Sequence, residues 1–118
     1  MTLPTRHTIR FAHASAAGAW WVLVDVDAAT ISWRGGEPPQ PLSGTELAHL
    51  CELADAVRPE HATLQPCHIT YAQDESLEIV RGDERCLIDA SNGEICAGPP
   101  GALVEALHAA VRTRRPGS

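Results

Sequence analysis

The chain has 118 residues, of which 44% are hydrophobic and 20% are charged, a composition typical of one globular domain with a single core. Fifteen acidic residues against nine basic ones give a net charge of −6, which repels a phosphate backbone and argues against nucleic-acid binding. No apolar run approaches the roughly 20 residues that a membrane-spanning helix needs, so we expect no membrane partner.

The start of the chain does not resemble a secretory signal. Arg6, His7 and Arg10 interrupt any apolar run there, and a cytoplasmic protein is therefore expected. We expect one domain over residues 1–118, with flexible ends at residues 1–6 and 113–118.

One segment precedes the apolar stretch from Trp20 to Trp33, and another follows it. Residues 7–14 alternate in polarity, with Ile9 and Phe11 on one face, and this pattern predicts a first strand. Residues 34–41, RGGEPPQP, predict a loop, because proline removes the backbone donors that a sheet requires.

The stretch from Trp20 to Trp33, WWVLVDVDAATISW, predicts a β-hairpin. Its β-branched and aromatic residues are interrupted by small and polar ones, and we expect a turn centred at residues 28–29. This turn pairs Val24 with Trp33 on the core face. The opposite face is mixed, since Trp21 and Leu23 lie on it beside aspartates.

Two amphipathic helices are predicted. The first begins at Ser43, which can form a capping box with Glu46, and it ends at Arg58 because Pro59 follows. The second begins near Pro100, since proline suits the first turn of a helix. Their apolar stripes comprise Leu47, Leu50, Cys51, Ala54 and Val57 in the first helix and Leu103, Val104, Leu107, Ala110 and Val111 in the second.

Between the helices, residues 64–97 predict a meander of short strands with turns at 73–76, 81–84 and 91–94. Arg81-Gly82-Asp83 matches an integrin-recognition tripeptide, and we interpret it as the middle turn. The expected register places Leu77 opposite Ala72 and Ile88, and Ile79 opposite Thr70 and Cys86.

Together these elements predict an α+β fold. We expect a two-layer sandwich of a mostly antiparallel sheet, with about six to seven short strands and both helices on one face. The order of elements, with LSGTEL opening the first helix and PPGALVEALHAAV in the second, is similar to that of small bacterial proteinase inhibitors of the emfourin kind. The likeness is one of layout from about residue 20 to 112, without the Ser-Gly-Gly segment expected after the first strand. It implies an inhibitor among protein-binding modules and assigns no site residues.

The cysteines and histidines form no recognised metal-ligand pattern, and no cofactor is expected. The adjacent pair Cys67-His68 places its side chains on opposite faces of a strand, which disfavours a shared metal ion. Cys67 with His61 or His68, oriented by Asp89, is the one combination that could form a thiol enzyme or a metal site. This chemistry is the alternative function.

The remaining cysteines and histidines have structural interpretations. Cys51 and Cys86 fall on core-facing positions, where a thiol behaves as a small apolar side chain. His49 and His108 lie off the apolar stripes of their helices, so we expect both at the surface.

The outer face of the sheet provides the functional hypothesis. Its apolar content exceeds what a monomer usually leaves exposed, unless a segment of the chain covers it. We therefore expect a non-catalytic protein-binding module of inhibitor, immunity or adaptor type, whose partner is another protein or a second copy of itself. The expected contact residues are Trp21, Leu23, Ile69, Tyr71, Val80 and Leu87, rimmed by Asp25, Asp27, Glu78 and Asp89.

Overall fold

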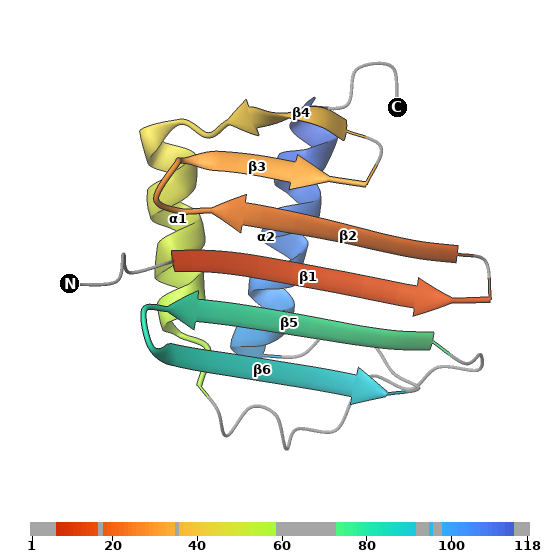
Figure 1. The fold of residues 1–118 in the computed structure, drawn as a ribbon. Helices are drawn as coiled ribbons and strands as arrows, with labels where there is room; N and C mark the ends of the chain where they lie inside the picture. Colours follow the sequence, from red (N-terminus) through yellow and green to blue (C-terminus); the bar gives the residue numbers. More distant parts are fainter. Residues whose placement is uncertain are drawn as a thin grey trace.

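The computed structural model describes residues 7–16, 18–34, 36–58, 73–91, 95 and 98–114. In these ranges, six strands form one antiparallel sheet in the order β4-β3-β2-β1-β5-β6, and two helices lie against one of its faces (Figure 1). This is the α+β class that the sequence predicts. Among the same residues, no helix is both long enough and apolar enough to cross a lipid bilayer.

The elements follow one another along the chain as six strands and two helices. They are β1 (His7–Ser15), β2 (Gly18–Asp25), β3 (Thr30–Trp33), β4 (Gly36–Pro41), α1 (Gly44–Asp55), β5 (Gln73–Arg81), β6 (Glu84–Ser91) and α2 (Gly98–Arg114).

Strand β1 lies in the middle of the sheet, and its alternating sequence accounts for that position. Ile9 and Phe11 are buried while Arg10 between them is exposed, as the predicted first strand requires. In the observed register, Ile9 lies opposite Val24 of β2 on one side and Ile79 of β5 on the other. All three of these cross-strand neighbours are buried, so they form the centre of the core.

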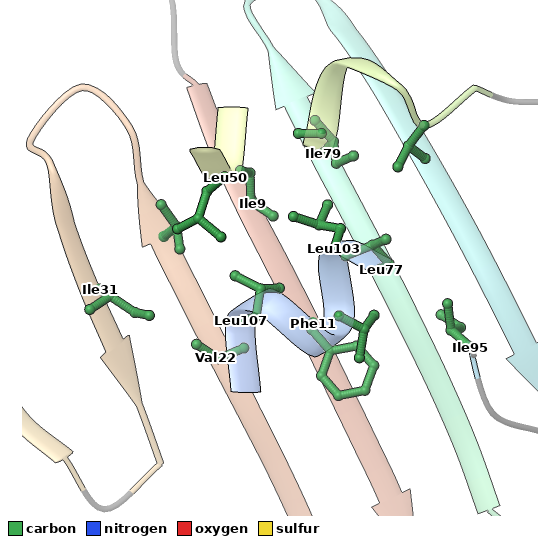
Figure 2. Packing of buried hydrophobic residues seen from close by; sticks show 14 of the residues in the cluster. Ile9, Phe11, Val22, Ile31, Leu50, Leu77, Ile79, Ile95, Leu103 and Leu107 are labelled. Carbon is green, nitrogen blue, oxygen red and sulfur yellow. The ribbon is translucent and has the colours of Figure 1, made fainter. Parts of the chain in front are cut away.

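The helices complete this core from one side. Figure 2 shows Leu50 of α1 and Leu103 and Leu107 of α2 pointing toward the apolar side chains of the strands. Leu103 and Leu107 have no exposed surface, and burying one such side chain contributes roughly 1.5–3 kcal/mol to the free energy of unfolding. The sheet therefore has one face packed under helices and one face that they leave uncovered.

The start of α1 is as predicted, and its end is not. The hydroxyl of Ser43 accepts a hydrogen bond from the Glu46 amide at 3.1 Å, and the Glu46 carboxylate accepts one from the Ser43 amide at 3.0 Å, which completes the capping box. The helix ends at Asp55 rather than at Arg58, because the amides of residues 56 and 57 bond to carbonyls three residues back and close the last turn. Val57 nevertheless stays buried beyond the helix end.

The predicted loop at residues 34–41 is wrong, since residues 36–41 form strand β4. Its proline-rich sequence is compatible with a strand because β4 lies at the edge of the sheet, where missing amide donors interrupt no ladder on the far side. Pairing with β3 places Pro41 opposite Thr30, and the register shifts between Ile31 and Trp33.

The predicted register of the central hairpin is also wrong, by two residues. Val24 lies opposite Ile31 rather than Trp33, because the turn, which spans residues 26–29, is centred between residues 27 and 28 rather than between 28 and 29. The Asp25 carboxylate accepts a hydrogen bond at 3.1 Å from a backbone amide inside this turn, which stabilises the longer connection. A shift of two preserves the side-chain parity, so the predicted division between the two faces is correct here.

In the second half of the sheet, the pairing of β5 with β6 is as predicted and the pairing on its other side is not. Leu77 lies opposite Ile88, and the two strands join through Gly82 and Asp83, with Gly82 at a φ of 60° that suits the first position of a tight hairpin turn. No turn occurs at 73–76, because β5 begins at residue 73 and pairs with β1, where Phe11 rather than Ala72 faces Leu77. For the same reason, Ile9 of β1 lies opposite Ile79, where the prediction placed Thr70. The strand expected over 64–72 lies outside the described residues, as do positions 92–94 of the third turn.

The end of α2 is fixed to the start of α1. Thr113 and Arg114, expected in a flexible tail, belong to the helix. The Arg114 guanidinium donates to both carboxylate oxygens of Glu46, at 2.7 and 2.5 Å, and to the carbonyl of Pro41 at 3.0 Å. This bidentate contact is the main reason that the pKa of Glu46 is lowered to about 2.

We expect Arg114→Ala to lower the free energy of unfolding by about 1–2 kcal/mol at pH 7, since it removes a bidentate ion pair that is partly shielded from solvent. Because the pKa of folded Glu46 is below its ordinary value of 4.5, this contribution is present above pH 4.5 and is lost as the pH falls toward 2. The difference between wild type and variant should therefore narrow at pH 3.5. Urea denaturation at the two pH values measures both effects. Arg112→Ala, an exposed arginine in the same helical turn, is the control, and equal losses for the two variants would contradict the assignment.

Candidate functional site

Four of the expected contact residues lie on the sheet face that the helices leave uncovered. Trp21 and Leu23 are on β2, Val80 is on β5 and Leu87 is on β6, each at a position alternate to the buried residues of its strand. Leu87 is 40% exposed, which is the largest exposure of any large apolar side chain in the described residues, and the other three are partly exposed. Ile69 and Tyr71 lie outside the described residues.

These four residues do not form one continuous apolar patch. Arg10 of β1 lies between Leu23 on one side and Glu78 on the other, and Glu78 lies next to Leu87. The row that crosses the middle of the face is therefore apolar at its ends and charged at its centre. The outer face is a mixed surface rather than the apolar one that the sequence suggested.

Three of the four expected rim carboxylates have partners within the chain. Asp25 accepts from the turn amide described above, and Asp27 accepts a hydrogen bond at 3.1 Å from the backbone amide of His7. Glu78 forms an ion pair with Arg85 on the neighbouring strand. Asp25 and Asp27 thus stabilise the turn and the start of β1.

A hollow of about 410 Å³ opens on this face, and no local sequence pattern predicts it. One row of cross-strand neighbours explains its shape: Trp21 lies opposite Ala12, Ala12 opposite Ser76, and Ser76 opposite Asp89. Two small residues therefore separate an indole ring from a carboxylate. This row depends on the strand order β2-β1-β5-β6, which brings together segments more than sixty residues apart in the sequence.

The neighbouring Trp20 points to the other side of the sheet and packs in a ring cluster. Its indole stacks on the His108 imidazole, with ring centroids 4.9 Å apart and an angle of 11° between the planes, and Phe11 contacts both rings edge-on. His108 was expected at the surface, and that prediction is wrong because Trp20 extends to the helix at this point. Burial lowers the pKa of His108, although Glu75 acts in the opposite direction.

A histidine–glutamate pair lies beside the ring cluster. His13 Nδ1 is 2.8 Å from one carboxylate oxygen of Glu75, and the other oxygen accepts a hydrogen bond at 2.8 Å from the Ile95 amide. Such a pair can orient an imidazole as a general base. Here both carboxylate oxygens are engaged, so Glu75 holds residue 95 and β1 against β5.

The thiol and metal alternative rests mostly on residues that are not described. Cys67, His61, His68 and Cys96 all lie outside the described ranges, whereas Asp89 is exposed on β6. Within those ranges no group of three or more histidine, cysteine, aspartate or glutamate side chains could hold a metal ion. Cys51 and Cys86 form no disulfide and are partly buried, and burial raises the pKa of the Cys51 thiol.

No protein-family model matches the sequence, and a search of curated proteins finds no significant match.

The ring cluster predicts a pH-dependent stability. The unfolded chain takes up a proton at His108 near its ordinary pKa of 6.5, whereas the folded chain does so only at lower pH, so the free energy of unfolding should fall as the pH decreases below 6.5. His108→Phe keeps a ring that can stack on Trp20 but cannot be protonated, and its stability should depend less on pH. Chemical denaturation at pH 8 and pH 5.5 tests this expectation. If the free energy of unfolding falls equally in wild type and variant between pH 8 and pH 5.5, His108 is not the source of the pH dependence. The charged and titratable groups near His108, namely Glu75, His13 and Arg112, are unchanged in the variant.

Proposed function

We propose that this protein is a small non-catalytic protein-binding module, of inhibitor, immunity or adaptor type, and that its outer sheet face contacts the partner. The observation that supports this most directly is the contrast between two adjacent tryptophans on β2. Trp20 is used by the core-side ring cluster, whereas Trp21 lies beside an open hollow on the face without helices. Tryptophan is the residue type most enriched at the energetic centres of protein interfaces.

The chemistry of the face favours a protein over other partners. Apolar groups at Trp21, Leu23 and Leu87 lie among charged ones, and tryptophan and arginine, here Trp21 and Arg10, are residue types enriched in protein interfaces. A net charge of −6 disfavours nucleic acid. Cys51 and Cys86 form no disulfide, which is compatible with a reducing compartment, and we propose a cytoplasmic location.

A different protein is a better partner than a second copy of this chain. Face-to-face pairing of two copies would bring the hollows and their exposed carboxylates, Asp74 and Asp89, toward each other. Like charges that meet in an interface destabilise the complex by several kcal/mol. A partner with a basic contact surface would instead form favourable pairs with this face.

Adjacent substitutions on β2 test the proposal. Trp21→Ala should keep the free energy of unfolding within about 1 kcal/mol of wild type and should abolish binding, because the side chain contributes to the outer face. Trp20→Ala should lower the free energy of unfolding by about 2–3 kcal/mol, since it removes the stack with His108. The partner is first captured from cells and then purified. Calorimetry then measures its affinity for wild type and for Trp21→Ala, with Glu105→Ala on the exposed side of α2 as the control. Binding should persist for the α2 variant.

Two results would contradict the proposal. Unfolding of the domain by Trp21→Ala would show that this residue belongs to the core, and unchanged affinity of the purified partner would show that the outer face is not the contact surface. Light scattering of the isolated chain provides a further check. A dimer that dissociates on Trp21→Ala substitution would make a second copy the occupant and would exclude a different protein as the partner of this face.

A further inference from the structure

We infer that the hollow receives an arginine or lysine side chain of the partner, between the indole of Trp21 and the carboxylates of Asp74 and Asp89. This inference rests on the proposed function and adds the chemistry of the group that is recognised. It follows from the shape of the hollow, from the charges that line it and from the residue types that form its floor.

The shape follows from the strand register. Neighbouring strands are about 4.8 Å apart, so Trp21 on β2 and Asp89 on β6, which are three strand spacings apart, flank a trough about 14 Å wide between their backbones. Ala12 and Ser76 form the floor between them. A trough with one aromatic wall and a floor of small residues accommodates a long, narrow side chain lying across the sheet.

The floor continues toward a second carboxylate. In the next row on the same face, Ala19 lies opposite Ala14, and Ala14 lies opposite Asp74. Ala14 and Asp74 are both exposed and both line the hollow. Two carboxylates therefore lie on the side of the hollow that faces Trp21.

The charges select a cation. On the outer face, the carboxylates of Asp74 and Asp89 and the guanidinium of Arg10 line the hollow. Asp74 and Asp89 are both exposed to solvent, whereas Glu75 extends to the opposite face, where it bonds to His13 and to the Ile95 amide. Arg10 lies at one end, next to Glu78 in the register, and leaves the hollow with an excess of negative charge. A cation gains from these carboxylates and also from the face of an indole ring, which attracts ammonium and guanidinium groups more strongly than other aromatic rings do.

The small residues are themselves informative. Alanine has a low β-propensity, and β-branched residues stabilise central strands better. Ala12 and Ala14 nevertheless occupy the middle strand, at positions that the helices do not cover. Filling the floor should therefore not harm folding, and Ala12→Val tests whether the space is needed for binding.

Blocked hexapeptides that alternate alanine with arginine are the probe, with citrulline and glutamate versions as the neutral and acidic counterparts. Nuclear magnetic resonance of the full chain follows the backbone amide signal of Ser76 on the floor of the hollow, which every variant retains. The arginine peptide should shift this signal in a saturable, salt-sensitive manner, and the citrulline and glutamate peptides should not. Trp21→Ala and Ala12→Val should each weaken binding of the arginine peptide by about tenfold, through loss of the ring and of the space respectively.

Charge variants separate a local site from attraction to an acidic protein. Asp74→Asn combined with Asp89→Asn should weaken binding of the arginine peptide by about three- to tenfold. Glu52→Gln combined with Glu105→Gln removes the same number of negative charges from exposed positions on the helices and should leave affinity unchanged. Dispersed amide spectra confirm that each variant is folded.

The results distinguish this inference from the proposed function. Absence of arginine-peptide binding, or equal weakening by the two double variants, would overturn the inference. If purified partner binding is still lost with Trp21→Ala, the outer face remains the contact surface and only the recognised group is wrong. If the peptide binds as expected but Trp21→Ala has no effect on the purified partner, the hollow is a site for basic side chains and the proposed function is wrong.

Discussion

The antiparallel pairing of β1 with β5 is the contact on which the rest of the structure depends. It joins residues 7–15 to residues 73–81, and it brings together two strands whose buried residues match in register. Ile9 meets Ile79 and Phe11 meets Leu77, and all four are almost completely removed from solvent. Closing so long a loop opposes folding through lost chain entropy, which burial of these side chains offsets.

The same pairing creates the outer face. Because side chains alternate along a strand, the register that joins Phe11 to Leu77 below the sheet also joins Ala12 to Ser76 above it. The trough beside Trp21 is thus a direct consequence of how the core is assembled. A shift of this register by one residue would disrupt both the core and the trough. Packing of the core therefore keeps the geometry of the outer face fixed.

Local signals in the sequence were sufficient for the elements that depend on near neighbours. The capping box of Ser43 and Glu46, the alternation of β1 and the turn at Gly82 each involve residues a few positions apart, and each was predicted correctly. β4 was missed because its prolines are unfavourable in a strand unless that strand lies at an edge, and edge position is a property of the whole sheet. The hollow was missed for the same reason, since its walls come from β2 and β6.

The two tryptophans of β2 show where sequence pattern reaches its limit. Strand periodicity alone assigns Trp20 and Trp21 to opposite faces, and the structure agrees. Periodicity also groups Trp20 with Val22 and Val24 on the core face, but it does not indicate that His108 of α2 stacks on Trp20 there. His108 in turn could not be assigned from its own helix, since it lies beside the apolar stripe and is only half-buried, by aromatic side chains from other elements.

This arrangement separates stability from recognition. The residues that hold the domain together, such as Ile9 and Leu77, point under the helices, whereas those that line the trough contribute little to the core. Substitutions at Ala12, Ser76 or Asp89 can therefore change the chemistry of the outer face while the register below it remains fixed. A sheet covered on one side thus provides a rigid platform whose open side can adapt to a particular partner, because each outer side chain is positioned by a buried neighbour on the same strand.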